Sequence, residues 1–218
     1  GIFNTLIGGS AGDALTDGAA NVAMGYTALT SDTRGSNSTA IGHAALGSQN
    51  FTTATSAYNT AVGSNAGGAV TTGTLNTLMG GLTGDALTSG NSNTAIGYSS
   101  LTADTLGDRN VALGAFTLTT QNFTTSVDSY NTALGFGTGN DITTGVQNTL
   151  VGGDAGANLT DADNNIAIGY QALSSDTLGS RSVAVGNNAL LNQNLTTATN
   201  TNNVAVGFSA GIAVTTGA

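Results

Sequence analysis

A pentapeptide close to Asn-x-Ala-aliphatic-Gly recurs twelve times, and it constrains the fold more than any other feature of this chain. The steps between successive motif glycines are 17, 17, 21 and 17 residues, and this order then repeats. A short fixed period is typical of solenoids, in which each repeat buries its apolar face against its neighbours. We therefore predict twelve stacked coils. The motif glycines are Gly8, Gly25, Gly42, Gly63, Gly80, Gly97, Gly114, Gly135, Gly152, Gly169, Gly186 and Gly207.

The four steps together make a second, longer repeat of 72 residues. The super-repeats 1–72, 73–144 and 145–216 align without a gap, and no shift in composition marks a boundary between them. We therefore predict one repetitive domain over 1–218. Because the chain begins without Met and ends where the next motif would start, we expect it to be an excerpt of a longer array.

The motif itself predicts a strand whose two faces are both apolar or small. The residue before each motif glycine is a large aliphatic, and the residue two places earlier is β-branched, as in Ile96 and Thr94. The residue between them is Ala in nine copies and Leu in three, at Leu6, Leu78 and Leu150. Residues two apart on a strand share a face, and β-branched residues suit a pleated surface. The pattern predicts an all-β fold, a parallel β-solenoid. Because a single-layer coil buries only its inner face, we expect the outer face to meet another surface.

The residues after each motif glycine indicate a tightly packed interior. The third residue after it is small in every copy, and the fourth alternates between Leu, as in Leu101, and Gly, as in Gly84. Dense interiors need such an alternation of large and small side chains. We expect the motif glycine to have a positive φ or to allow close approach between coils. The Asn that opens ten of the motifs, such as Asn93, is expected to turn the chain and to form hydrogen bonds from coil to coil.

The third coil of each super-repeat is four residues longer than the others, and the extra residues predict three protruding loops, each pinned by one apolar residue. Departures from a repeat are where solenoids tend to place binding surface, so the loops are candidate recognition sites. The alternative is that the loops only cap neighbouring coils, with the apolar residue tucked against the roll. The candidate loop residues are Asn50, Phe51, Asn122, Phe123, Asn194 and Leu195.

Composition excludes several classes of function. The net charge is −9, there is no Lys, and the three cations are Arg34, Arg109 and Arg181. Without clustered Lys and Arg, we expect binding neither to nucleic acid nor to anionic lipid. No apolar run approaches the ~20 residues of a membrane span. With no Cys in the chain, a disulfide framework and a thiolate metal site are both excluded.

Few side chains could carry catalysis or bind a metal. His43 is the single histidine, and the chain has no Glu, Lys or Cys, so we predict neither an enzyme nor a cofactor or metal site. Asp32, Asp104 and Asp176 recur in the same turn of the second coil. At ~4.8 Å per coil they lie about 19 Å apart, which is too far for one metal. We expect each of them to cap a turn, and an ion shared around a threefold axis is the alternative.

Aromatic residues also recur in columns, one place after the motif glycine. Exposed aromatics can stack on sugar rings or lie at a subunit contact. We favour packing at the edge of the core for both columns. The first column holds Tyr26, Tyr98 and Tyr170, and the second holds Ser64, Phe136 and Phe208.

Several copies of the motif resemble the head repeat of trimeric autotransporter adhesins. NVAMGYTAL (21–29), NTAIGYSSL (93–101) and NIAIGYQAL (165–173) come close to that family's Asn-Ser-Val-Ala-Ile-Gly core, with a small residue three places on. The repeat is also similar to those of trimeric phage tail fibres, and the resemblance covers all twelve coils. It implies a left-handed β-roll in which three chains lie side by side, with the outer faces of the motif strands on the threefold axis. The steps of 17 and 21 residues are longer than those usual in adhesin heads.

These observations favour a structural and adhesive fibre segment, a trimeric β-roll rod of a surface adhesin or a virion tail fibre. We expect it to be extracellular and to present host- or surface-recognition loops, with a host-surface glycan or protein as partner. The alternative is a monomeric solenoid that binds ice or carbohydrate through a flat face of Thr and Asn. The oligomeric state separates the two hypotheses.

Overall fold

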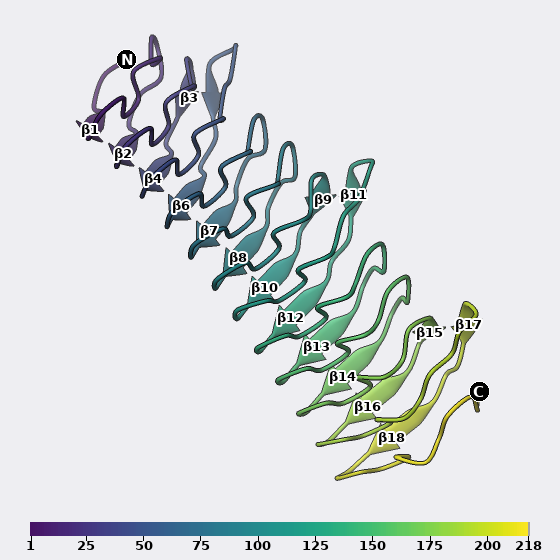
Figure 1. The fold of residues 1–218 in the computed structure, drawn as a ribbon. Coiled ribbons are helices and arrows are strands. Elements are labelled where there is room, and N and C mark those ends of the chain that lie inside the picture. The colour runs from purple at the N-terminus through teal and green to yellow at the C-terminus, as the bar shows by residue number, and fades with distance from the viewer. Residues whose placement is uncertain (218) are drawn as a thin grey trace.

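A computed structural model of the chain describes residues 1–217, and it is a parallel β-solenoid without helices (Figure 1). One short strand from each coil joins a single twelve-stranded parallel sheet, in which the strands follow one another in chain order. The predicted all-β parallel solenoid is therefore confirmed. The strands of this sheet are β1 (Thr5–Ile7), β2 (Val22–Met24), β4 (Thr39–Ile41), β6 (Thr60–Val62), β7 (Thr77–Met79), β8 (Thr94–Ile96), β10 (Val111–Leu113), β12 (Thr132–Leu134), β13 (Thr149–Val151), β14 (Ile166–Ile168), β16 (Val183–Val185) and β18 (Val204–Val206).

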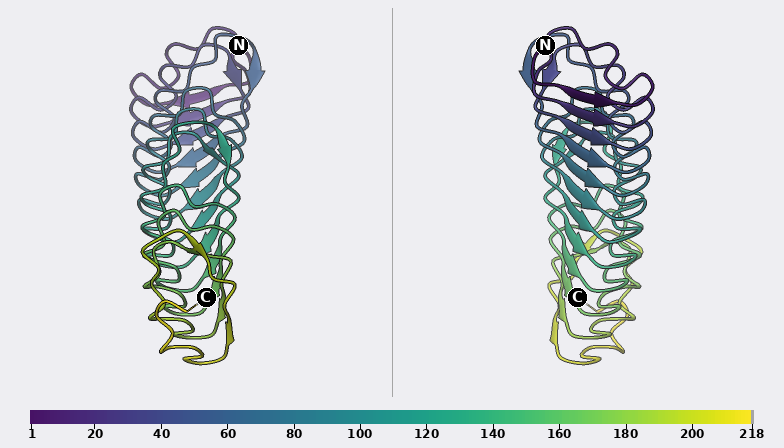
Figure 2. Two further views of the ribbon diagram at one scale, coloured as in Figure 1. Left: turned by 90° about the vertical axis from the view of Figure 1, so that its right-hand side faces the viewer. Right: turned by 90° about the vertical axis from the view of Figure 1, so that its left-hand side faces the viewer.

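The register places equivalent motif residues side by side, as in the pairing of Thr39 with Thr60 and of Ile41 with Val62. The stacked coils form an elongated rod with the two termini at opposite ends (Figure 2). Within residues 1–217 there is no helix that could cross a membrane.

Three further two-stranded sheets join the second coil of each super-repeat to its longer third coil. They are β3 (Gly35–Ser36) with β5 (Thr55–Ser56), β9 (Gly107–Asp108) with β11 (Val127–Asp128), and β15 (Gly179–Ser180) with β17 (Thr199–Asn200).

Each strand of the large sheet turns its middle residue, Ala in nine copies and Leu in three, inward and its two flanking residues outward. In β8 the side chain of Ala95 is fully buried, whereas Thr94 and Ile96 are only partly buried. Successive side chains of a strand point to opposite faces, and the other strands repeat this arrangement except β1 at the end of the rod, where the middle residue Leu6 is 43% exposed. The coil is thin at the sheet because the inward position holds Ala in most copies. The large aliphatic residues of the motif therefore lie on the outside of the roll.

In the core, a large side chain in one coil fills the space left by glycines in the same and the neighbouring coil. In the first coil of the second super-repeat the middle strand residue is Leu78 rather than Ala. Its two methyl groups lie in the space that a side chain at Gly67 or Gly84 would need, because a Cβ at either position would lie 2.8 or 2.9 Å from them. The large-and-small alternation read from the sequence is therefore a packing requirement of the interior.

The corners of each coil are made by residues in the left-handed region. The motif glycine is one of them, as at Gly97, where φ is +136° and an added Cβ would lie 2.4 Å from the carbonyl oxygen of Gly114. Both predictions for the motif glycine, positive φ and close approach of coils, are confirmed. Other corners are left-handed without glycine, as at Leu29 and Arg109. Such residues cost about 1–2 kcal/mol each in isolation, so the surrounding coils must hold them in place.

The motif asparagines form a buried ladder along the rod. The Oδ1 of Asn93 accepts a hydrogen bond from the backbone N–H of Asn110 in the next coil at 2.9 Å. Its Nδ2 donates to the carbonyl of Gly107, also at 2.9 Å, which closes its own coil. Both asparagines are fully buried, so each hydrogen bond satisfies a backbone group that water cannot reach. The predicted coil-to-coil bonding is confirmed. Most of its partners are backbone groups, and the Nδ2 of Asn110 also donates to the Oδ1 of Asn93 at 3.2 Å.

Candidate functional site

The widest candidate surface is the outer face of the large sheet. We call it the outer stripe, and it consists of the first and third residues of the twelve strands. All of these residues are Thr, Val, Ile, Leu or Met. Even mid-rod positions such as Met79 and Leu113 are about 40% exposed, at 40% and 39% respectively. An uncharged apolar surface of this extent, which runs the length of the rod, is typical of an interaction site.

The predicted aromatic column borders this stripe. Tyr26, Tyr98 and Tyr170 are all more than half exposed, yet the rings lie against glycines of the preceding coil. A Cβ on Gly81, for example, would lie 3.5 Å from the Cδ2 of Tyr98. His43 is exposed and stacks on Tyr26, with ring centroids 5.8 Å apart. One face of each tyrosine ring is therefore packed at the edge of the coil while the rest faces outward.

The second aromatic column is also on the surface. Phe136 and Phe208 are strongly exposed, and Ser64 occupies the same place in the fourth coil of the first super-repeat. Phe116, one residue further along its coil, lies edge-on between Tyr98 and Phe136, with centroids 5.6 Å from each. Tyr98, Phe116 and Phe136 thus form one continuous cluster.

The recurring aspartates are inside the coil rather than on a surface turn. The Oδ1 of Asp32 accepts from the N–H of Gly35 at 2.9 Å, so the predicted turn cap is confirmed. Its Oδ2 accepts from the Nε2 of Gln49 in the next coil at 2.6 Å, and both side chains are fully buried. The same pairing recurs between Asp104 and Gln121 and between Asp176 and Gln193.

The sequence pattern did not reveal these glutamines as partners of the aspartates. The Oε1 of Gln49 also accepts from the Nδ2 of Asn59 at 2.9 Å, which connects the pair to the asparagine ladder. Burial raises the pKa of Asp104, against the hydrogen bonds from Gln121, Gly107 and Phe123, which lower it. A carboxylate enclosed and bonded in this way has a structural role, because no substrate can reach it. The pairing could have been predicted from the sequence, because each Asp and its Gln occupy the same position in consecutive coils.

The three long loops are anchored to this buried pair. Phe51, Phe123 and Leu195 are 5–6% exposed, as expected for the apolar residue that pins each loop. The N–H of Phe51 donates to the Oδ1 of Asp32 at 3.2 Å. The asparagine before each apolar residue is exposed, and at Asn50 its Oδ1 accepts from the hydroxyl of Thr33 at 3.1 Å. The loop bases are therefore fixed, while recognition by the loops stays a prediction. Asn122 and Asn194 repeat this arrangement with Thr105 and Thr177.

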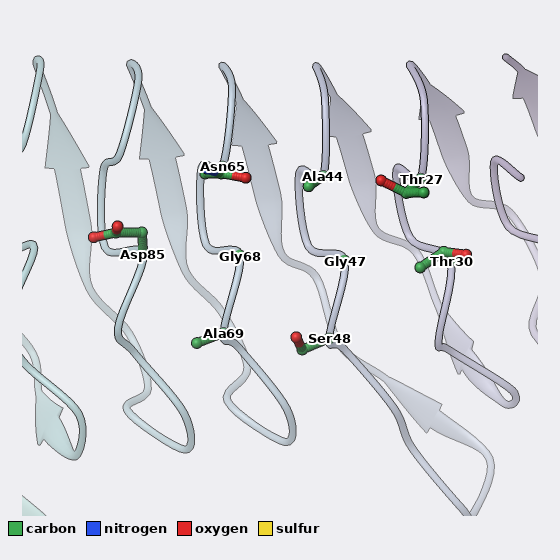
Figure 3. A pocket seen from close by; sticks show the side chains of 9 residues that line it. All are labelled: Thr27, Thr30, Ala44, Gly47, Ser48, Asn65, Gly68, Ala69 and Asp85. Carbon is green, nitrogen blue, oxygen red and sulfur yellow. The ribbon is translucent and has the colours of Figure 1, made fainter. Parts of the chain in front are cut away.

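A shallow groove of about 550 Å³ lies on the segment that follows the strand in coils two to five (Figure 3). We call it the corner groove. The groove is open because Ala44, Gly47 and Gly68 are small. At the positions of the two glycines, the second super-repeat carries Thr119 and Asn140. The sequence pattern did not indicate this groove, although two glycines at the same place in consecutive coils were a signal for it. The lining residues are Thr27, Thr30, Ala44, Gly47, Ser48, Asn65, Gly68, Ala69 and Asp85.

Among residues 1–217, no three His, Cys, Asp or Glu side chains come close enough together to hold a metal ion. No family model, curated protein or solved structure matches this chain. The candidate surfaces are therefore the outer stripe with its aromatic border, the three long loops and the corner groove.

Proposed function

We propose that the chain is a structural and adhesive segment of an extracellular fibre, in which three copies pack side by side through their outer stripes. The observation that carries this proposal is the position of the large aliphatic residues of the motif. They point out of the roll, and a single chain leaves them partly exposed along all twelve strands. Hydrophobic burial at ~25 cal/mol per Å² gives such a surface a strong tendency to associate.

The dimensions of the stripe suit association of identical chains. Twelve strands at ~4.8 Å per strand make a stripe of about 58 Å. Large exposed apolar patches of more than a few hundred Å² are rare on monomers. Because the stripe is similar at every level, identical chains in parallel can place each strand against its own copies. A closed threefold arrangement would then cover the outer face of every chain.

The interior supports the role of a stiff spacer. Each coil is tied to the next by the parallel strands and by the buried asparagine ladder. In solenoids, stability comes from such interfaces between neighbouring coils. Adding coils therefore lengthens the rod without requiring a larger core. A segment of this kind holds recognition loops at a distance from the surface to which the fibre is attached. Its long loops recur once per super-repeat, which favours weak multivalent attachment to a repetitive partner.

Sedimentation of the segment at micromolar concentration tests the assembly. One chain has a mass of 21.2 kDa, and we expect a species of three times this mass. Ile96→Asp, in the middle of the outer stripe, should shift this species to monomer. Thr124→Asp, in an exposed loop, is the matched control and should leave it unchanged. A wild-type segment that sediments as a stable monomer would contradict the proposal.

A monomeric solenoid that binds ice or carbohydrate is the second candidate, and one observation favours it. The first residue of each strand on the outer stripe is Thr in seven of the twelve copies, and four of these threonines, from Thr39 to Thr94, lie on consecutive strands of the parallel sheet. The motif asparagines contribute nothing to such a face away from the two ends of the rod, because eight of the ten are buried in the ladder. This candidate predicts thermal hysteresis of a monomeric segment. A trimer without hysteresis would reject it.

A further inference from the structure

We propose that the corner groove of the first super-repeat binds a neutral stretch of glycan. The inference deepens the adhesive part of the proposed function, on which it rests, by naming a site and a class of ligand. It does not depend on the packing of three chains. All nine lining residues lie outside the twelve strands, so the groove is separate from the outer stripe (Figure 3).

The shape of the groove suits an extended ligand. Its volume of about 550 Å³ falls within the ~300–1,000 Å³ that is usual for ligand sites. It runs from Thr30 in the second coil to Asp85 in the fifth, which is about 14 Å at ~4.8 Å per coil. A shallow furrow of this length along a rod fits a chain of linked rings better than a compact small molecule.

The floor and the rim carry both hydrogen-bond acceptors and donors. A Cβ on Gly47 would lie 3.2 Å from the carbonyl oxygen of Ala44 and 3.5 Å from that of Thr27, so both acceptors lie beside this glycine, and that of Ala44 already accepts from the N–H of Gly47 at 3.1 Å. The side chains of Thr27 and Asn65 point toward Ala44 from either side (Figure 3). Sugar hydroxyls donate and accept at the same atom, and this mixed lining satisfies both functions.

Several of the lining groups are held in place before any ligand arrives. The hydroxyl of Thr30 donates to the Oδ1 of Asp13 at 2.7 Å, and the carboxylate of Asp85 accepts from the hydroxyl of Thr102. Within residues 1–217, the side chains of Ser48 and Asn65 have no such partner, which leaves their donors for a ligand. Fixed acceptors with uncommitted donors between them reduce the ordering cost of binding.

Charge decides which glycans fit. The lining contains the carboxylate of Asp85 and no cation, and the carboxylate of Asp13 accepts a hydrogen bond from Thr30. Sulfated, phosphorylated or sialylated glycans would be repelled, whereas a carboxylate accepts two hydroxyl protons of a neutral sugar well. The stacked rings of Tyr26 and His43, immediately before Thr27 and Ala44 in sequence, add an exposed aromatic surface beside the groove.

The other super-repeats carry larger residues at the positions of the two groove glycines, so they show which substitutions would fill the groove. Gly47 and Gly68 correspond to Thr119 and Asn140 in the second super-repeat, and to Leu191 and Ile212 in the third. Neither groove glycine has a left-handed backbone, and an added Cβ would lie 3.2 and 3.4 Å from its nearest neighbour. The double variant Gly47→Thr, Gly68→Asn should therefore fold, because equivalent coils already carry these residues.

The experiment titrates the segment with neutral gluco-, galacto- and manno-oligosaccharides and with sialylated and sulfated ones, by NMR and calorimetry. We expect binding of at least one neutral series. The double variant should weaken that binding by tenfold or more, and Asp85→Asn should also weaken it. The control Leu191→Thr, Ile212→Asn introduces the same residues in the third super-repeat and should change nothing.

Three results would overturn the inference: binding of none of the neutral series, binding of the anionic glycans alone, or unchanged binding by the filled variant. Sedimentation of the same samples separates this inference from the proposed assembly. If the segment is a trimer that binds no glycan, the glycan-binding inference is rejected and the proposed assembly stands. If it is a monomer that binds glycan through the groove, the assembly is rejected and the glycan-binding inference stands.

Discussion

The outer stripe and the opposite, returning side of the coil vary in different ways along the rod. On the outer stripe the residues stay aliphatic or Thr through all twelve strands. On the returning side one position is Gly47, Thr119 or Leu191 in the three super-repeats, and the third coil of each super-repeat carries a longer loop. Folding depends on the strands, the buried Asn ladder and the core, so outward side chains on either side are free to serve another purpose. A uniform surface suits assembly of identical chains, and a varied one suits recognition.

The strongest test of this comparison is a charge on each face of one strand. Ala95→Asp places a carboxylate in the closed interior of β8, where no partner is present, and should cost more than about 4 kcal/mol of folding free energy. Circular dichroism should show a lower melting temperature, or loss of the β signal, for this variant. If Ala95→Asp melts like the wild type, Ala95 faces outward and the flanking residues face the interior.

The neighbouring residue gives a smaller and different effect. The side chain of Ile96 points outward from the same strand, and a single chain leaves it partly exposed. Ile96→Asp should therefore fold as a monomer with a loss of about 1 kcal/mol or less, typical of surface substitutions. In the assembled trimer the same carboxylate would be buried against its copies, at a cost of several kcal/mol.

Melting measured above and below the association concentration separates these two costs of Ile96→Asp. Thr124→Asp, in the long loop, should be nearly silent at both concentrations. Equal losses at positions 96 and 124 under all conditions would mean that the outer stripe is not an interface.

Shortening the long loops tests whether the returning side of the coil serves recognition. Deleting residues 52–54, 124–126 and 196–198 keeps the buried Phe51, Phe123 and Leu195 that anchor them. Because the removed residues are exposed, we expect a fall in melting temperature of only a few degrees. Attachment to a target surface should fall sharply if the loops recognise it. A large drop in stability with attachment intact would leave the loops purely structural.

The smallest expected effect is a pH dependence from the buried aspartate beneath the second loop. Burial raises the pKa of Asp104 in the folded state, so the folded chain holds a proton there more tightly than the unfolded chain does. Its contribution to stability is therefore greatest below the ordinary Asp pKa, and it is lost as pH rises through the folded value. Asp104→Asn removes this dependence.

Unfolding by denaturant between neutral and acidic pH measures the effect of Asp104. The wild type should gain stability relative to the Asn variant as pH falls. The opposite slope would mean that the hydrogen bonds from Gln121, Gly107 and Phe123 outweigh burial.

The sequence by itself determined what repeats with the backbone. The number of coils, the position and parallel register of the strands, the left-handed motif glycines and the Asn ladder all follow from a motif at fixed steps. Each of these is a property of one coil and its immediate neighbour, so a periodic pattern is enough to predict it. The buried apolar residue in each long loop was predictable for the same reason.

The tertiary structure alone decided which face of the strand turns inward, which polar residues meet in the core and where the surface is hollow. Thr94, Ala95 and Ile96 read as apolar or small on both sides, and only the direction of coil closure sends Ala95 inside. Asp104 and Gln121 lie 17 residues apart, and they meet because the returning segments of consecutive coils superpose. The corner groove arises in the same way, from small residues of two consecutive coils. These features depend on the path by which each coil closes, and a period along the chain does not specify that path.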